Sequence, residues 1–481
     1  MFSNTSAELS LNVPSRCISS VKNDTRNHRF LVGTCTLPPP QQNNRDYMGG
    51  NAPVNPLYLL RYHEEMNEMA VDAQLDFGDD EDASHGEIWS CSSCPLDSSL
   101  VITCRSANDG TISTSTAQTE TALWRIPETA MKVDDIDFYP DESDCDQHRA
   151  EELTKSMGKV CDLDLGPGRV TDMQWNPGCI PNCNDFDESI GQITGANLIT
   201  VQSGNRELCV TSFDVDSSYA AKLDQVNFQI PNTRGYMPNP PKASWDPHNQ
   251  HLCAVTLGTN IAILDMRTPA KLTNGLKSCH RFGVTDLDYN PNKPNVLSSS
   301  GQDGLVKFWD LRFTASYDDE PHGNTSSWAS HSPLRTVRGG HTHFITCVKY
   351  NSFHDQLILS GGTDSIVNLW RISSISSAPL IDLGGSAADD DFAAADDDHS
   401  YDDNPVVGSF ENVGENAEDA DSVGTDGGNA PDVRVTKMEM REAIYDLTWS
   451  AADPWLFVTL GYDGNVVLNH VPSKEKYKIL L

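Results

Sequence analysis

Two aspartate–histidine pairs are the residues in this sequence best suited to chemistry. His280 precedes Asp303 by 23 residues, and His341 precedes Asp364 by the same interval. A carboxylate that orients an imidazole is the arrangement by which hydrolases activate a serine or cysteine nucleophile. A pair that recurs at one spacing instead indicates a repeated structural bond, because a buried carboxylate needs donors around it. The motifs GxxxxGK[ST], GxSxG and HExxH do not occur, so we expect neither an enzyme nor a cofactor.

Both pairs belong to a repeated sequence unit. The segments GQDGLVKFWDLR (301–312) and GGTDSIVNLWRI (361–372) each place an aspartate six residues before a tryptophan, Trp309 in the first and Trp370 in the second. A third copy, GYDGNVVLNHV, carries Asp463 but no tryptophan. A repeated unit of turn, aspartate, strand and tryptophan is typical of the blades of a β-propeller.

A second marker locates the blades independently. An aromatic residue is followed by polar turn residues, often with proline, at Trp175, Trp245, Tyr289, Tyr350 and Trp449. Each aromatic ends a segment that alternates apolar and polar residues, which indicates an inner strand followed by a turn. At roughly 44 residues per blade the chain can hold seven. The expected fold is all-β, a seven-bladed WD40 β-propeller with long disordered acidic insertions.

The ring must be closed by a strand from one end of the chain, because a free sheet edge invites unwanted pairing. Either Glu8–Val13 or Tyr477–Leu481 could supply that strand, and the sequence leaves both open. The expected organisation is a segment 1–15 that possibly closes the ring, blades one to six over 16–375 with an acidic loop near 128–159, a disordered acidic insertion at 376–433, and blade seven with a C-terminal strand over 434–481.

The charge of the chain excludes several partner classes. Its 34 Lys and Arg against 69 Asp and Glu give a net charge of −35, and no Lys or Arg lies between Arg371 and Arg434. Nucleic acids and anionic membranes both require dense positive charge, so neither is an expected partner. The start of the sequence, MFSNTSAELSLNVPS, does not look like a signal peptide, and no long apolar run predicts a membrane span. We expect a cytoplasmic protein.

The cysteines do not predict a metal site. Of the 13, Cys91 and Cys94 form a CxxC and Cys179 and Cys183 a CxxxC, but no second pair follows at the spacing of a zinc site. We expect them to be small buried hydrophobic residues in a reducing compartment.

One rim of the predicted propeller is a candidate interaction surface. In propellers of this kind, partners often dock where the inner strands begin, and the exposed positions there lie six and four residues before each marker aromatic and one before the turn aspartate. The hydrophobic and cationic residues expected at such positions are Trp89, Arg169, Phe344, Tyr445 and Tyr462. Aromatic residues and arginine dominate protein-binding hot spots. The alternative is that Trp89 and Phe344 pack beneath insertions.

Several segments resemble one particular family of propellers. They are FLVGTCTL (30–37), HGEIWSCSSCP (85–95), DLDYNPNKPNVLSSSGQDGLVKFWDLR (286–312), YNSFHDQLILSGGTDSIV (350–367), SISSAPL (374–380), WSAADPWLFVTLGYDG (449–464) and the final KYKILL. Together they are similar to the EARP- and GARP-complex-interacting WD40 proteins, also called the tumour-suppressing subchromosomal transferable fragment candidate family. The sequence departs from that family in longer insertions around 38–56, 128–159 and 385–430.

This resemblance implies a non-enzymatic scaffold. It implies binding to subunits of the EARP and GARP tethering complexes, as a monomer within a larger assembly and without direct membrane insertion. It further implies recruitment from the cytoplasm to endosomes and the trans-Golgi network, with roles in endosomal recycling, endosome-to-trans-Golgi retrograde transport and dense-core vesicle maturation.

Two other protein classes remain open. Trp309 to Arg312 fits the WDxR pattern of substrate receptors of cullin-type ubiquitin ligases, although WD repeats often end in this way. The acidic tracts would also suit a histone-binding WD40 protein, because histones are basic.

Overall fold

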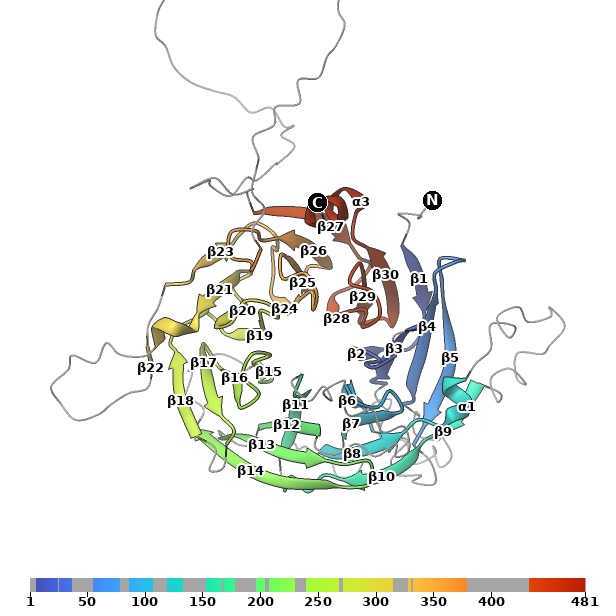
Figure 1. Ribbon diagram of the computed structural model, residues 1–481. Helices are drawn as coiled ribbons and strands as arrows, with labels where there is room; N and C mark the ends of the chain where they lie inside the picture. The colour runs from blue at the N-terminus through green and yellow to red at the C-terminus, as the bar shows by residue number, and fades with distance from the viewer. Residues whose placement is uncertain are drawn as a thin grey trace, which may run out of the picture.

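The computed structural model describes fourteen stretches of the chain. These are residues 6–24, 26–36, 55–77, 86–106, 119–132, 153–166, 168–177, 196–203, 207–229, 239–267, 271–314, 328–329, 332–378 and 432–480. They form seven sheets arranged as blades around a central channel, as Figure 1 shows. The fold is therefore the expected seven-bladed β-propeller.

The first three blades use the strands between β2 and β14, numbered from the channel outward. Blade one contains β2 (Ser15–Ser20), β3 (His28–Thr34), β4 (Leu57–His63), β5 (Glu68–Asp76) and β9 (Thr154–Ser156). Blade two contains β6 (Ile88–Ser93), β7 (Leu100–Ser106), β8 (Thr119–Arg125) and β10 (Gly158–Asp162). Blade three contains β11 (Arg169–Trp175), β12 (Ala196–Ser203), β13 (Glu207–Val215) and β14 (Ala220–Gln229).

The next three blades follow in chain order. Blade four contains β15 (Ala243–Trp245), β16 (Leu252–Leu257), β17 (Asn260–Asp265), β18 (Lys271–Leu276) and β22 (Trp328–Ala329). Blade five contains β19 (Val284–Tyr289), β20 (Val296–Gly301), β21 (Val306–Asp310) and β23 (Arg335–Val337). Blade six contains β24 (Ile345–Tyr350), β25 (Leu357–Gly362), β26 (Ile366–Arg371) and β27 (Val433–Glu439).

Blade seven joins the two ends of the described chain. It contains β28 (Ile444–Trp449), β29 (Leu456–Gly461), β30 (Asn465–His470) and, as its outer strand, β1 (Ala7–Ser10). In Figure 1 the blue β1 lies beside the red β30, and the two pair antiparallel from Ala7–Leu468 to Ser10–Asn465. Of the two chain ends that the sequence left open, the first provides the closing strand.

The expected strand over the last residues is wrong. The structure has a helix there, α3 (Ser473–Leu480), whose Glu475 is buried and forms a 2.7 Å ion pair with the buried Arg371 of blade six. Ile479 packs with the core residues between blades six and seven. A segment without a free sheet edge beside it gains more by burying one helical face.

Two expected boundaries also move. The strand β27 pairs with β26, so residues 434–439, which the sequence assigned to blade seven, complete blade six together with Val433. The acidic region 128–159 is not wholly a solvated loop, because its described residues form the short helix α1 (Glu128–Met131) and β9, which covers the edge of β5 by parallel pairing. Of the insertion 376–433 that was expected to be disordered, residues 379–431 lie outside the described residues, whereas Ser376 and Asp432 near its two ends are buried and ordered.

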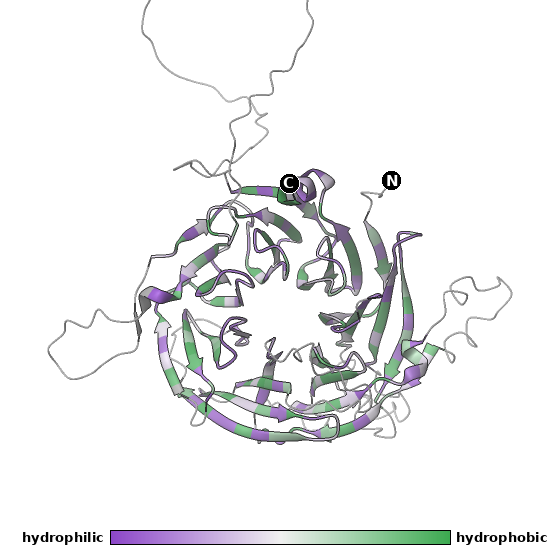
Figure 2. Ribbon diagram, viewed as in Figure 1, coloured by the Kyte–Doolittle hydropathy of each residue, from purple (hydrophilic) through white to green (hydrophobic). Residues whose placement is uncertain are grey.

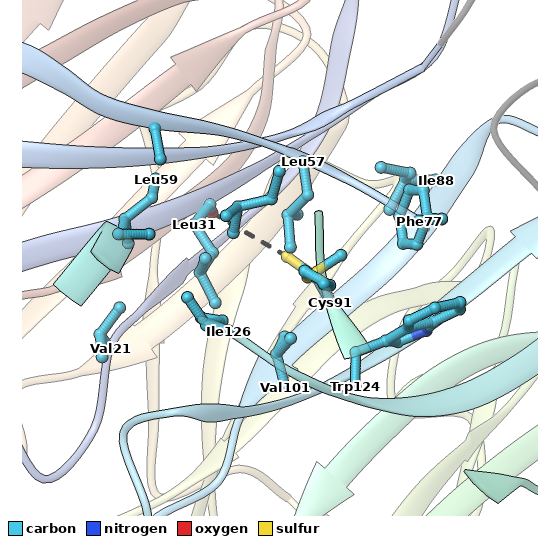
Figure 3. Close-up of a cluster of buried hydrophobic side chains, with 14 of the residues drawn as sticks. Val21, Leu31, Leu57, Leu59, Phe77, Ile88, Cys91, Val101, Trp124 and Ile126 are labelled. Carbon is cyan, nitrogen blue, oxygen red and sulfur yellow. Dashed lines mark hydrogen bonds between the residues drawn. The ribbon is translucent and has the colours of Figure 1, made fainter. Parts of the chain in front are cut away.

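Apolar side chains fill the spaces between neighbouring blades. Figure 2 shows hydrophobic residues along the strands of every blade, and Figure 3 shows the cluster that joins blades one and two. There Leu31, Leu57, Phe77 and Trp124 surround Cys91, whose thiol lies 3.9 Å from the carbonyl oxygen of Leu31. This packing holds the seven inner strands at fixed positions around the channel.

Candidate functional site

The histidine–aspartate pairs form closed hydrogen-bond chains inside blades five and six. In blade five, His280 Nδ1 lies 2.8 Å from Asp303 Oδ1 and His280 Nε2 lies 2.8 Å from Ser299 Oγ. Trp309 Nε1 donates to the same Ser299 oxygen at 2.9 Å. Burial lowers the pKa of His280 even though Asp303 acts to raise it, so the imidazole is neutral and accepts from the serine hydroxyl. Every polar side-chain atom in this hydrogen-bond chain has a partner, because the second oxygen of Asp303 accepts from the Arg281 N–H at 3.1 Å.

Blade six repeats this arrangement. His341 lies 3.1 Å from Asp364 and 2.8 Å from Ser360 Oγ, which accepts from Trp370 Nε1 at 2.9 Å. The serine thus occupies the place where a catalytic nucleophile would be, but in both blades it is buried and bonded to tryptophan. The geometry is architectural, and the sequence reading missed the two serines.

Glycine is required beside the hydrogen-bond chains of blades five and six. A Cβ atom at Gly301 would overlap the His280 ring, and one at Gly362 would lie 2.7 Å from His341 Nδ1. In blade seven, which lacks the histidine and tryptophan, Asp463 keeps only the turn contact of the unit, accepting from the Asn465 N–H at 3.0 Å.

A β-bulge near the start of the inner strand recurs in six blades. The pairing register shifts between Ser15 and Cys17 and at the matching place in β6, β11, β19, β24 and β28. Each bulge leaves one residue outside the ladder, and bulges commonly re-aim a side chain in this way. The six bulged residues are Arg16, Trp89, Thr171, Thr285, Thr346 and Tyr445, and all six line the mouth of the channel cavity, whose volume is about 680 Å³.

The bulged residues are of two kinds. In blades three, five and six they are threonines with bonded hydroxyls; Thr346, for example, donates to the carbonyl oxygens of Gly361 and Ile444 at 3.0 and 2.7 Å. In the adjoining blades seven, one and two they are Tyr445, Arg16 and Trp89, which are too large to make this local bond. Blades seven, one and two therefore present large side chains at the position where blades three, five and six carry a hydrogen-bonded threonine.

Tyr445 and Tyr462 of blade seven and Phe344 of blade six lie at the surface. Tyr445 and Tyr462 stack with ring centroids 5.2 Å apart and are 38% and 42% exposed. The carbonyl oxygen of Tyr462 accepts from the Ser15 N–H at 3.2 Å, which places the tyrosine pair beside Arg16. Phe344 is 39% exposed and packs 4.3 Å from the His343 ring, centroid to centroid.

Trp89 is arranged differently from the sequence expectation. It is half-buried and packs against the core between blades two and three. The guanidinium carbons of Arg16 and Arg169 lie 3.5 and 3.4 Å from the centroid of its ring. Trp89 is therefore neither fully exposed, as a binding hot spot would be, nor packed beneath an insertion. The side chains of Arg16 and Arg169 cover its indole ring instead.

Deeper in the channel, charged residues are mostly paired. Lys349 Nζ lies 3.0 Å from Asp286, and Lys242 Nζ lies 3.7 Å from Asp172. The two aspartates also accept backbone N–H groups of the next blade, from Val348 at 3.0 Å and from Ala243 at 2.8 Å. These inner-strand aspartates join blade to blade.

Cysteines of the described residues have structural positions. Cys91 and Cys94 are buried in two different apolar clusters, and burial raises the pKa of Cys94. No three His, Cys, Asp or Glu side chains converge as a metal site within the described stretches. Cys179 and Cys183 lie outside them.

The seven sheets and the repeated His–Asp–Ser–Trp hydrogen bonds define the class of protein, a seven-bladed WD-repeat β-propeller. Its candidate binding surface is the mouth of the channel. Comparison with known proteins narrows the class. Residues 200–370 match the family model described as the EIPR1 beta-propeller. The chain is 28% identical over 479 residues to the human EARP and GARP complex-interacting protein 1, covering 98% of this chain and 97% of that protein.

Other relatives match over similar lengths. An EARP-interacting protein homolog from Gekko japonicus is 29% identical over 478 residues, covering 98% of this chain and 97% of its own. The WD repeat-containing protein DWA2 of Arabidopsis thaliana is 24% identical over 462 residues, covering 96% and 95%. The chain is thus similar along nearly its whole length to EARP and GARP complex-interacting propellers.

Proposed function

We propose that this protein is a non-catalytic scaffold that binds subunits of the EARP and GARP tethering complexes. The observation that carries the proposal is similarity along 98% of the chain to relatives whose names state that interaction. The likeness extends over the whole propeller rather than over single blades.

The binding surface in this proposal is the arc at the channel mouth formed by blades seven, one and two, together with Arg169 of blade three. Tyr445, Tyr462 and the Arg–Trp–Arg stack provide aromatic and guanidinium groups, the side chains that most often carry interface binding energy. Phe344 extends the arc toward blade six. Large side chains at bulged positions that elsewhere carry threonine support a role for the arc other than holding the fold.

Through such binding the protein acts in endosomal recycling, endosome-to-trans-Golgi retrograde transport and dense-core vesicle maturation. Its place in the cell then follows from its partners on endosomes and the trans-Golgi network. No helix among the described residues is long and apolar enough to cross a bilayer. Recruitment through protein contacts is consistent with the net charge of −35, which opposes binding to anionic lipid.

The WDxR reading has less support than the tethering-complex reading. Arg312 is bonded to Asp310 within the same turn, with Nε 2.9 Å from Oδ1, so the arginine already has a structural partner. Its position is what a WD repeat needs to end a strand, independent of any ubiquitin ligase.

Affinity purification of the full-length chain followed by mass spectrometry tests the proposal. Recovery of tethering-complex subunits is the expected result. Recovery of a cullin adaptor or of histones in their place would contradict it and assign the protein to one of the two alternative classes.

A further inference from the structure

The two arginines at the channel mouth hold Trp89 between them. Arg16 comes from blade one, Trp89 from blade two and Arg169 from blade three. With guanidinium carbons 3.5 and 3.4 Å from one ring centroid, the two cations cannot share a face of the indole without overlapping. They therefore lie on opposite faces, and the stack holds both guanidinium groups against the ring.

The two guanidinium groups differ in their charge partners. Arg16 Nη1 lies 3.4 Å from Glu87 Oε2, and both residues are partly exposed. The Arg169 side chain forms no ion pair or hydrogen bond with the described residues, and its Nε is buried without an acceptor. The Glu87 carboxylate lies beyond ion-pair distance and acts only to raise the pKa of Arg169. Burial and the charge of Arg16 both lower the pKa of Arg169.

Comparison with other cations of the cavity shows that Arg169 lacks an ion-pair partner. Lys242 and Lys349 each form an ion pair with an aspartate, whereas Arg169 and Lys22 form none among the described residues. Arg169 is half-buried, and the like charge of Arg16 acts on it more strongly than the opposite charge of Glu87. Such an arrangement costs stability, because the charge is partly desolvated and repelled. A costly cation held in a fixed plane at a cavity mouth is suited to meeting an anion from outside.

We propose that Arg169, supported by Arg16, binds the carboxylate of an aspartate or glutamate in an extended segment of the protein partner. A planar guanidinium matches a carboxylate by two parallel hydrogen bonds. Tyr445 and Tyr462, which lie beside Arg16, offer apolar contact for the same segment. The inference rests on the proposed function and adds the chemistry by which the partner is recognised.

Overall charge makes the site selective. The chain carries −35 in total, so an acidic segment is repelled by most of the molecule. Arg169 offers such a segment a place where the charges match. This favours a partner with a single acidic residue among apolar and neutral ones over a strongly acidic tract.

A zero-length carbodiimide cross-link tests the contact directly. The reagent joins an amine to a carboxylate that already touches it, so Arg169→Lys, which keeps the positive charge, provides the amine at the site. The full-length variant is mixed with purified EARP complex, cross-linked and mapped by mass spectrometry. A bond from position 169 to an Asp or Glu of a complex subunit is expected. Bonds from other lysines of the chain to that complex, with none from position 169, would overturn the inference.

A charge-removing substitution separates this role from a structural one. Arg169→Gln is expected to weaken binding of purified EARP complex by roughly tenfold or more. The melting temperature should stay level or rise, because the repulsion of Arg16 is relieved. Arg434→Gln is the matched control: Arg434 also lies near a tryptophan, 6.0 Å from the Trp370 ring centroid, but on the outer strand β27.

The outcomes distinguish the two proposals. If the unaltered chain binds no tethering complex, the proposed function fails and this inference fails with it. If the unaltered chain binds and Arg169→Gln binds equally well, only the inference fails. A lowered melting temperature with unchanged binding would show that Arg169 serves the fold.

Discussion

Asp446 of blade seven accepts, through Oδ2, a 3.1 Å hydrogen bond from the backbone N–H of Ile18 in blade one. The same bond joins blade three to blade four through Asp172, and blade five to blade six through Asp286. Each aspartate lies directly after the bulge of its inner strand. The ring is thus closed between residues 18 and 446 by the same contact that joins its interior blades.

Asp446→Ala should destabilise the closure. The Ile18 N–H would lose its acceptor at a buried position, a loss that costs about 1–3 kcal/mol of unfolding free energy. Urea unfolding of the full-length chain measures it. Glu442→Ala, an exposed carboxylate three residues before β28 residue Tyr445, is the control and should change the free energy by less than about 0.5 kcal/mol. Equal effects of the two substitutions would mean that the inter-blade bond contributes nothing.

Removing residues 1–10 should expose a sheet edge. Without β1, the strand β30 has unpaired backbone groups along Asn465–Leu468, and such an edge promotes association. We expect a lower melting temperature and concentration-dependent aggregation, followed by light scattering. A truncated chain that stays monomeric with the original melting temperature would show that β1 is dispensable for closure.

Each buried serine should contribute more to the unfolding free energy than a single hydrogen bond would. Ser299→Ala removes the partner of both His280 Nε2 and Trp309 Nε1, so two buried polar atoms lose a bond. A loss of about 1–3 kcal/mol is expected in denaturant unfolding. Ser10→Ala, at an exposed serine that donates to Asn12, is the comparison and should be nearly neutral. A double-mutant cycle with His280→Gln should show coupling, whereas additive losses would argue against a connected chain.

Acidification should weaken the fold through the buried histidines. Burial lowers the pKa of His280 and His341 below the ordinary value of about 6.5. Below about pH 6.5 the unfolded chain protonates these histidines more readily than the folded chain does. The folding free energy that they contribute is therefore fully present above about pH 6.5 and is lost as the pH falls toward their lowered pKa values. Unfolding free energies measured near pH 7.5 and 5.5 should differ less for the double variant His280→Gln/His341→Gln than for the unaltered chain. An undiminished difference would place the pH dependence elsewhere.

The repeat units predicted the blades because their residues are fixed by local geometry. Asp303, Trp309 and Gly301 occur together since one turn and one strand require them, and that regularity is visible in the sequence. The closing strand was ambiguous because β1 has only four residues and no distinctive pattern. The helix α3 was missed because its Glu475 depends on Arg371, more than a hundred residues away, for its partner.

The position of the candidate site could be predicted from the sequence, but its backbone geometry and its contacts between blades could not. Counting back from Trp449 finds Tyr445, but the count does not reveal that the residue lies in a bulge. Arg16 was missed because blade one lacks the marker aromatic from which to count. Its stacking on Trp89 is a contact between blades, and only the closed ring brings the two residues together.

The most direct measurement is recovery of tethering-complex subunits by the variant Trp89→Thr/Tyr445→Thr. Threonine is the residue that blades three, five and six carry at the same bulge, so the fold should persist, although loss of the half-buried Trp89 ring should lower the melting temperature. Phe353→Thr, which replaces an exposed aromatic beyond the opposite end of β24, is the control. We predict that recovery falls by roughly tenfold or more for the double variant and is unchanged for the control. Undiminished recovery by a folded double variant would contradict the assignment of the channel mouth as the binding surface.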